Sequence, residues 1–402
     1  MENGQASSTA PQNADAIRVM IVDDSAVVRG LVTRMLEGDS GIQVVASVGN
    51  GQMALSSLER NDVDVILLDI EMPVMDGLTA IPKLLSIDPG VQIIMSSTLT
   101  LKGADVTMRA MEAGAADYIP KPTATREISG GTDFRQDLIS KVRAWGAVRR
   151  RLPRKTPTRG LGTPGRNWAS TSTQAKTDGQ GGTAGRSSAQ TFGHSAGHTG
   201  PVVLRPAATE VPEIIAIGSS TGGPQALFTV LGAIKPGAIP QPILITQHMP
   251  ATFTTILGEH ISRISGWKAA EAQDGEVIRP NRIYIAPGDF HMVVESRGVE
   301  KVLRINKNPP ENFCRPAVDP MLRSLSAAYG KRVLAVILTG MGSDGLRGGQ
   351  TLTAAGGTVI AQDEPSSVVW GMPGAAATGG ICSAVLPLAE ISGYIQKMAT
   401  RR

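Results

Sequence analysis

The sequence predicts an α/β protein of two domains, each built around a parallel β-sheet. Its 402 residues are enough for two separate hydrophobic cores. Short apolar runs alternate with helical patterns in residues 16–148 and again in residues 207–402, and such alternation is typical of parallel sheets covered by helices. Residues 149–206 lack this periodicity and are rich in Gly, Ser, Thr, Pro and Gln. We therefore expect two domains joined by a flexible linker.

The chain carries no sign of a membrane or secreted protein. Residues 1–15 are polar and are expected to be disordered, and no run of 18 apolar residues or signal-peptide core occurs. Cys314 and Cys382 are isolated and lack the spacing of metal ligands or of a disulfide framework. These features predict a soluble, cytoplasmic protein.

The excess of positive charge is confined to one segment. Residues 149–205 contain ten Lys and Arg residues and one acid, Asp178, for a net charge of +9. The formal charge of the whole chain is +4, so the remaining residues carry −5. Because the basic residues belong to the linker and not to a folded surface, nucleic-acid binding is only weakly supported.

Five strands and five helices alternate in the first domain. Strands are predicted at 17–22, 42–48, 63–68, 91–95 and 115–119, and helices at 26–37, 51–60, 78–86, 103–113 and 134–148. Five such units predict a doubly wound parallel sheet with its functional site at the carboxyl ends of the strands.

Acidic and hydroxyl side chains follow these strands. Asp23 and Asp24 come after the first strand and Asp69 after the third, and a hard cation such as Mg²⁺ stabilises three carboxylates brought together. A bound Mg²⁺ would draw phosphoryl oxygens toward Asp69, while Lys121 supplies positive charge and Ser97 a hydrogen bond. Alternatively, acidic residues simply end strands and cap helices. Five such side chains at the carboxyl ends of four strands favour the phosphoryl site.

This half of the chain resembles the receiver domain of two-component response regulators, which has a flavodoxin-like fold. The resemblance rests on Val22-Asp-Asp-Ser25, Leu68-Asp-Ile-Glu-Met-Pro73 with Asp76-Gly77, and Lys121-Pro122. It implies that a histidine kinase phosphorylates Asp69, that the three carboxylates bind Mg²⁺, that Lys121 contacts the phosphoryl group, and that Pro122 follows a cis bond. Ser97, in preference to Thr98, is interpreted as the switch hydroxyl.

A strand, a tight turn and a helix are predicted over residues 213–231 of the second domain. Gly218, Ser220 and Gly222 have the G-x-S-x-G spacing, in which small residues let the backbone turn sharply and hold a serine oxygen beside helix N-terminal amides. Ser220 is therefore the candidate nucleophile. The five-residue pattern alone fits a Gly/Ser capping loop without chemistry equally well.

A serine nucleophile needs a base and an acid that orients the base. Two further apolar runs deliver His248 and Asp344 at their carboxyl ends. Taken singly, each has an ordinary structural interpretation, as a satisfied histidine or a helix-capping aspartate. Because strand ends converge on one crevice in an open α/β sheet, the three residues together favour a Ser-His-Asp triad. His291 is a second candidate base.

The second domain resembles the CheB family of chemotaxis protein-glutamate methylesterases over residues 212–390. The motifs are, in order, Ile217-Gly-Ser-Ser-Thr-Gly-Gly-Pro224, Gln247-His-Met-Pro250, Ile285-Ala-Pro-Gly288, Arg315-Pro-Ala-Val-Asp319, Leu338-Thr-Gly-Met-Gly342 with Asp344-Gly345, and Ala361-Gln-Asp363 with Gly371-Met-Pro373. The resemblance implies a hydrolytic enzyme that removes methyl esters from chemoreceptor glutamates and deamidates receptor glutamines, without a cofactor for ester hydrolysis. It further implies that the unphosphorylated receiver covers the active site.

The same resemblance assigns roles within the site. It ranks His248 above His291 as the base, and it places oxyanion donors at the backbone N–H groups near Met341 and Thr221. Ser219 stands where the family usually has Ala, and the G-x-S-x-G register favours Ser220 over it. The order Ser, His, Asp differs from that of α/β-hydrolases, so we do not assign that fold.

Some features leave alternatives open. Strands at 282–286, 291–295 and 301–305 have no helices between them and predict a β-hairpin insertion. Arg315 either orients a substrate carboxyl group or pairs with Asp319. A DNA-binding output or a non-catalytic receptor scaffold are the rival functions; the sequence has no helix-turn-helix signature and retains all three triad residues.

Overall fold

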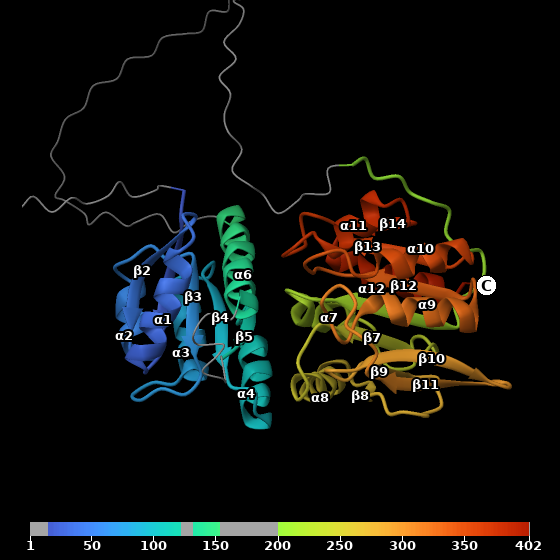
Figure 1. Ribbon diagram of the computed structural model, residues 1–402, viewed down its shortest axis with the longest axis horizontal. Coiled ribbons are helices and arrows are strands. Elements are labelled where there is room, and N and C mark those ends of the chain that lie inside the picture. The colour runs from blue at the N-terminus through green and yellow to red at the C-terminus, as the bar shows by residue number, and fades with distance from the viewer. Residues whose placement is uncertain (1–14, 122–131, 153–199, 402) are drawn as a thin grey trace, which may run out of the picture.

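The computed structural model describes residues 15–121, 132–152 and 200–401, which form two α/β domains side by side (Figure 1). The predicted disordered N-terminus, most of the predicted linker and Pro122 lie outside the described residues. No helix in the described part of the chain is both long enough and apolar enough to cross a bilayer.

The first domain is a five-stranded parallel sheet covered by helices on both faces. The strand order is β2-β1-β3-β4-β5. The strands are β1 (Ile17–Val22), β2 (Ile42–Val48), β3 (Val65–Asp69), β4 (Gln92–Ser97) and β5 (Asp117–Pro120), and the helices are α1 (Ala26–Glu37), α2 (Gly51–Leu58), α3 (Gly77–Ile87), α4 (Leu101–Glu112) and α6 (Thr132–Arg151). This confirms the predicted doubly wound fold.

The buried strands explain why the sequence was readable here. β3 is buried along its whole length, because helices lie on both sides of it, and a strand buried on both faces appears as a continuous apolar run. The helices begin at the expected polar residues. Ser25 accepts a hydrogen bond from the Val28 amide at the start of α1, and Asp76 accepts one from Thr79 at the start of α3.

Helix α6 continues beyond the predicted start of the linker at residue 149. Arg149 is buried at 3% exposure and its guanidinium lies 2.9 Å from the Asp88 carboxylate. Farther back in α6, Trp145 donates a 3.1 Å hydrogen bond to the buried carboxylate of Asp117 in β5. The first of the basic residues assigned to the linker therefore belongs to the folded receiver.

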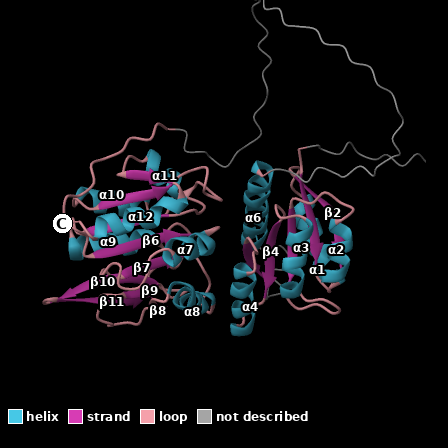
Figure 2. Cartoon of the chain, turned by 180° about the vertical axis from the view of Figure 1, so that it is seen from behind, coloured by secondary structure: helices cyan, strands magenta, loops and turns pink. Residues whose placement is uncertain are grey.

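The second domain is a seven-stranded parallel sheet in the order β14-β13-β12-β6-β7-β9-β8. Helices again cover both faces (Figure 2). The strands are β6 (Ile214–Ser219), β7 (Ile243–Gln247), β8 (Lys268–Glu271), β9 (Arg282–Ile285), β12 (Val333–Ile337), β13 (Thr358–Gln362) and β14 (Ala384–Leu386), and the helices are α7 (Gly223–Gly232), α8 (Phe253–Ser265), α9 (Val318–Tyr329), α10 (Leu346–Ala354), α11 (Met372–Thr378) and α12 (Leu388–Ala399).

The predicted hairpin insertion is present but smaller than expected. Strands β10 (His291–Arg297) and β11 (Glu300–Asn306) pair antiparallel as a separate two-stranded sheet. The remaining strand of the predicted set, β9, instead lies between β7 and β8 in the main parallel sheet. Its apolar residues Ile283, Tyr284 and Ile285 are fully buried there, so it is a core strand and not part of the insertion.

The two domains contact each other through α4 and β5 of the first and α8 of the second. Tyr118 of β5 stacks on Phe253 of α8 with their ring centroids 4.5 Å apart, and both side chains are buried. At the edge of this contact the Glu112 carboxylate of α4 accepts hydrogen bonds from His260 at 2.9 Å and Arg263 at 2.7 Å. An apolar centre with charged groups at its edge thus joins the domains.

Candidate functional site

The predicted nucleophile turn is formed between β6 and α7. β6 ends at Ser219 and α7 begins at Gly223, so Ser220 lies in the turn itself. Gly222 has a φ of 73°, which a residue with a side chain adopts only under strain. A Cβ atom on Gly223 would lie 2.0 Å from the Gln247 side-chain oxygen. The two glycines therefore allow a turn that side chains at those positions would prevent.

The structure distinguishes the two adjacent serines. The Ser219 side chain is fully buried, and its hydroxyl donates a 2.6 Å hydrogen bond to Gln247 Oε1. The Ser220 side chain is only partly buried, and its hydroxyl has no hydrogen-bond partner in the described part of the chain. Ser220 is thus the serine whose oxygen is available to react.

Strand pairing brings His248 next to this turn. β6 and β7 pair in parallel with Ser219 opposite Gln247, so Ser220 and His248 are the next residues on neighbouring strands. The His248 amide donates a 3.1 Å hydrogen bond to the Ser219 carbonyl. On the other side, His248 Nε2 lies 2.8 Å from Asp344 Oδ2. The three residues predicted from separate strand ends therefore lie at one edge of one sheet.

Asp344 is held by the start of α9. Its carboxylate is buried and accepts hydrogen bonds from the amides of Val318 at 2.6 Å and Asp319 at 3.0 Å. Burial alone would raise the pKa of Asp344, but the His248 ring and these amides outweigh burial and hold the pKa below its ordinary value. Asp344 is therefore ionised and fixed in orientation.

The same pair changes the basicity of the imidazole. Burial alone would lower the pKa of His248, whereas the hydrogen bond to Asp344 and the neighbouring Cys314 raise it. The net shift is upward, because the carboxylate favours the charged ring. Cys314, which was not predicted at the site, thus contributes to the electrostatic environment of the His248 ring.

Two backbone amides are free beside the nucleophile. Within the described part of the chain, the N–H groups of Thr221 and Met341 make no hydrogen bond. A Cβ atom on Gly340 would lie 2.8 Å from Ser220 Cβ, so the loop that carries Met341 passes directly against the serine. These are the amides that the sequence indicated as oxyanion donors.

Gln247 is a site residue that sequence reasoning missed. Its Nε2 donates to the carbonyls of Ser220 at 2.9 Å and His248 at 3.2 Å, while its Oε1 accepts from Ser219. One buried side chain thus joins the backbones of the candidate nucleophile and base. Its position immediately before His248 at a strand end was the available signal.

His291, the second candidate base, is a structural residue. It is buried at 1% exposure, its Nε2 donates to the Pro309 carbonyl at 3.1 Å, and its Nδ1 accepts from the Ala317 amide at 3.2 Å. Both ring nitrogens are occupied, so this histidine has no free nitrogen for a substrate proton.

Arg315 does not pair with Asp319. Its guanidinium donates to the carbonyls of Lys307 at 3.4 Å and Asn308 at 3.3 Å. The Asp319 carboxylate instead accepts hydrogen bonds from backbone amides at the start of α10 and from Asn312. The first alternative, contact with a substrate carboxyl group, stays a prediction.

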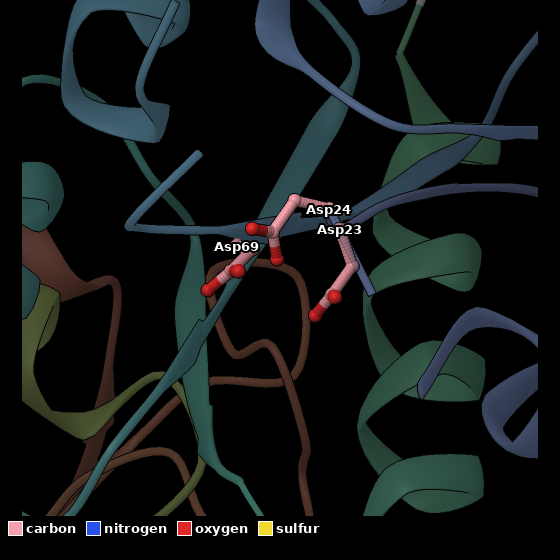
Figure 3. Close-up of side chains that lie close together, drawn as sticks. All are labelled: Asp23, Asp24 and Asp69. Carbon is pink, nitrogen blue, oxygen red and sulfur yellow. The ribbon is translucent and has the colours of Figure 1, made fainter. Parts of the chain in front are cut away.

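The receiver contains the predicted acidic cluster at the carboxyl ends of β1 and β3 (Figure 3). One carboxylate oxygen each of Asp23, Asp24 and Asp69 lies within 4.8 Å of the others. Lys121 Nζ lies 2.8 Å from Asp69 Oδ1 and 3.1 Å from Asp23 Oδ2. Burial raises the pKa of Asp69, as does the Asp23 charge, and Lys121 acts against both. This all-oxygen, strongly negative set fits a hard divalent cation.

Ser97 is not placed as predicted. Its hydroxyl is buried and donates to the Gly103 carbonyl at 3.1 Å. A cavity of about 260 Å³ beside Asp69 is lined by Ser96 and Thr98 and not by Ser97. Ser96 pairs with Asp69 across β3 and β4, so these two side chains share one face of the sheet. The hydroxyl on the Asp69 face of the sheet is therefore that of Ser96, one residue before the predicted Ser97.

Comparisons with known proteins agree with both halves of this description. Residues 19–130 match the response regulator receiver domain model, and residues 215–395 match the CheB methylesterase model. The chain is 68% identical over 388 residues to protein-glutamate methylesterase/protein-glutamine glutaminase 1 of Paramagnetospirillum magneticum, covering 96% of this chain and 97% of that protein. It is 60% identical over 388 residues to the protein of the same name from Rhodospirillum rubrum, covering 96% of each.

Among solved structures, the Thermotoga maritima CheB methylesterase catalytic domain is 39% identical, with a TM-score of 0.45, and covers 46% of this chain and 98% of that domain. A receiver followed by an α/β methylesterase domain defines a response regulator with a hydrolytic output. The chain belongs to the CheB family of protein-glutamate methylesterases/protein-glutamine glutaminases.

Proposed function

We propose that the second domain hydrolyses glutamate methyl esters on chemoreceptors, and deamidates receptor glutamines, through Ser220, His248 and Asp344. The observation that carries this proposal is the 2.8 Å pair of His248 and Asp344 at the strand end next to the unpartnered Ser220 hydroxyl. Family membership gives the reaction class, and this geometry supports the choice of the three residues. An output by DNA binding or by a non-catalytic scaffold is not favoured, because residues 215–395 match a methylesterase model.

The proton path follows from which ring nitrogen is occupied. Asp344 accepts a hydrogen bond from His248 Nε2 and thereby leaves Nδ1 to take the Ser220 proton. Ser220 Oγ attacks the ester carbonyl, and the imidazolium then protonates the departing methanol oxygen. Water attacks the resulting acyl-serine ester, its proton passes to His248, and the glutamate carboxylate leaves as Ser220 is reprotonated.

The developing oxyanion would be met by the free amides of Thr221 and Met341. Both belong to loops that flank Ser220, and neither amide has to break a protein hydrogen bond before it can donate. Donors fixed in advance cost no reorganisation during the reaction, which is why such amides stabilise the tetrahedral intermediate effectively. A glutamine amide would use the same arrangement, with ammonia as the leaving group.

The receiver is proposed as a phosphorylation switch with Asp69 as the acceptor and a histidine kinase as the donor. Asp23, Asp24 and Asp69 would hold Mg²⁺, which when bound neutralises negative charge around the phosphoryl group. Lys121 already contacts Asp69 and is placed to follow the added charge. Ser96, on the same face as Asp69, is the hydroxyl proposed to bind a phosphoryl oxygen.

A contact between the domains links the switch to the nucleophile turn. Val368 lies against Gly222, where a Cβ atom would come within 2.6 Å of it. The same Val368 packs against the core of the receiver on the side of α6, and Arg151 of α6 donates a 3.4 Å hydrogen bond to the Ser367 carbonyl. One loop of the second domain is therefore held between the receiver and the turn that carries Ser220.

Methanol release from a methylated chemoreceptor tests this function. Wild-type protein should release methanol, and Ser220→Ala should reduce the rate by about 10⁴-fold or more, since removal of a triad nucleophile leaves only the contribution of binding and the oxyanion donors. Ser219→Ala is the matched control and should keep most of the activity. Loss in Ser219→Ala with activity retained in Ser220→Ala would show that the wrong serine has been assigned.

A further inference from the structure

Two buried aspartates cap each other's helices beside the candidate active site. Asp344 precedes α10 and accepts hydrogen bonds from the first amides of α9. Asp319 lies in the first turn of α9 and accepts from the amides of Gly345 at 3.0 Å and Gly348 at 2.7 Å, where α10 begins. Each carboxylate is therefore stabilised by the N-terminus of the other's helix, and both are 1% exposed.

Two buried carboxylates this close repel each other. Burial, first, and the charge of Asp344 raise the pKa of Asp319, while its hydrogen bonds act in the opposite direction. Asp344 must nevertheless present an ionised oxygen to His248. A hydrogen-bond donor shared by both carboxylates would reduce this repulsion.

Asn312 is that donor. Its side-chain Nδ2 lies 2.9 Å from Asp344 Oδ1 and 3.0 Å from Asp319 Oδ2. An amide nitrogen carries two hydrogens, and both partners here are carboxylate oxygens, so the nitrogen and not the amide oxygen must face them. Each hydrogen satisfies one carboxylate.

The turn around Asn312 is built for this contact. Asn312 has a φ of 51°, a left-handed conformation that asparagine tolerates better than most residues. Glu311 and Cys314 close the turn by exchanging backbone hydrogen bonds of 3.1 Å and 2.9 Å. The same turn thus contributes Asn312 to Asp344 and Cys314 to the neighbourhood of His248.

We propose that Asn312 is a positioning residue for the hydrolytic reaction, because it fixes the Asp344 carboxylate so that Oδ2 faces His248. This inference rests on the proposed function of Ser220, His248 and Asp344. With Oδ1 held by Asn312 and Oδ2 held by His248, rotation of the carboxylate would break both bonds. Without the Asn312 amide, Asp344 and Asp319 lose their shared donor, and Asp344 Oδ1 keeps only the backbone amides of Asp319 and Gly345, so the carboxylate is held less firmly against the imidazole.

The charged and titratable groups around Asp344 and His248 come from two elements. Asp319 and Arg323 belong to α9, and Glu311 and Cys314 belong to the turn. The Arg323 guanidinium lies 2.9 Å from the Glu311 carboxylate, so Glu311 largely neutralises its charge. Asp319 is the group whose charge Asn312 separates from Asp344.

The test compares two substitutions of Asn312 in full-length protein. Asn312→Ala removes the donor, and Asn312→Asp keeps the shape but replaces the donor with a third carboxylate. We expect kcat to fall about 10-fold in Asn312→Ala, with KM changed less than about twofold, because a group left unsatisfied in the interior typically costs that much. Asn312→Asp should lose more, and the acid limb of its kcat/KM profile should move about one pH unit upward, because a nearby negative charge favours the imidazolium.

Asn308→Asp is the matched control, since it makes the same chemical change at an exposed side chain nearby. It should leave kcat and the pH profile unchanged. NMR titration of the His248 ring in each variant gives the same pKa comparison without any need for turnover. Thermal unfolding shows whether each variant is folded.

Three results separate the possibilities. Wild-type kcat and an unshifted His248 pKa in both Asn312 variants would overturn the positioning role. A fall in Tm together with an unshifted His248 pKa would also overturn it, because it would show a purely structural residue. Methanol release that does not depend on Ser220 would instead overturn the proposed function, and the NMR titration would still decide the role of Asn312.

Discussion

The two sites occupy the same position in two similar sheets, but different kinds of group stabilise their carboxylates. In the receiver, Lys121 is the cation that contacts the acidic cluster, and the adjoining cavity is about 260 Å³. In the second domain, Asp344 is buried and accepts hydrogen bonds from His248, Asn312 and backbone amides. The first site has negative charge left to be neutralised, so a metal ion and a phosphoryl group can change it. In the second, donors within the chain already satisfy the Asp344 carboxylate, as the proposed preorganised catalytic site requires.

If the receiver pocket depends on added charge, its chemistry should stop entirely when the metal is removed. We expect a small phosphodonor to label the protein on Asp69 in the presence of Mg²⁺, with no label in Asp69→Asn or after EDTA. The reason is that Asp23, Asp24 and Asp69 repel an incoming phosphoryl group unless a cation lies among them. Mass spectrometry of the labelled protein gives both the extent and the position of the label.

Asp76→Asn is a suitable control, because Asp76 caps α3 and is not part of the cluster. It should be labelled like the wild type. Label that persists in Asp69→Asn would mean that the acidic cluster is not the acceptor site.

The activity of the Ser220 site should be sensitive to replacement of the Asp344 carboxylate by an amide. Asp344→Asn should lower kcat by about 10⁴-fold, because an amide can hold the ring in the wrong tautomer and cannot support its charge. The pH profile adds a second measurement. Asp344 raises the pKa of His248, and the base must be neutral to accept the serine proton, so kcat/KM of the wild type should rise with pH through a midpoint above the ordinary histidine value of about 6.5.

The residual activity of Asp344→Asn should show this midpoint at lower pH, because the group that favours the imidazolium has been removed. Asp289→Asn, at an exposed aspartate of the same domain, should leave both kcat and the midpoint unchanged. An acid limb in Asp344→Asn at the wild-type position would show that another group sets the pH dependence.

Much of this organisation was readable in the sequence, because both sites follow strands that are buried on both faces. Such strands appear as apolar runs, and the polar residue that ends each run is a candidate for the site. Ser220, His248, Asp344 and Asp69 were all proposed as site residues in this way. Membership of a sheet was harder to read, since the apolar run of β9 does not show whether its neighbours are parallel or antiparallel.

Other details depended on side-chain direction or on contacts between distant residues. Ser96 and Ser97 differ by one position, and one position along a strand moves a side chain to the opposite face. Arg149 looked like a linker residue because it is charged, yet its partner Asp88 lies 61 residues away. Asn312 gave no signal, because its contacts with Asp344 and Asp319 arise only when two helices meet.

The smallest expected effect concerns the contact between the two domains, through which the receiver site could act on the site around Ser220. The buried stack of Tyr118 on Phe253 shows that the domains are packed together in this structure. The loop with Val368 touches both the receiver and the nucleophile turn. Phosphorylation can change activity only if it alters the relative stability of this docked state, and couplings of about 1–3 kcal/mol correspond to about 5- to 150-fold in rate.

Glu112→Lys tests this coupling without a phosphodonor. Glu112 accepts hydrogen bonds from His260 and Arg263 across the interface, so a lysine there would replace attraction by repulsion. Arg263 is about half exposed, and such an ion pair contributes about 0–1 kcal/mol, so we expect the basal rate of methanol release to rise only a few-fold. Glu59→Lys, which makes the same change just after α2, should have no effect.

The fragment of residues 207–402 should be at least as active as Glu112→Lys, because it lacks the receiver altogether. Equal rates for the fragment, Glu112→Lys and unphosphorylated wild type would mean that docking does not restrain the active site, and would leave the receiver with a role in targeting.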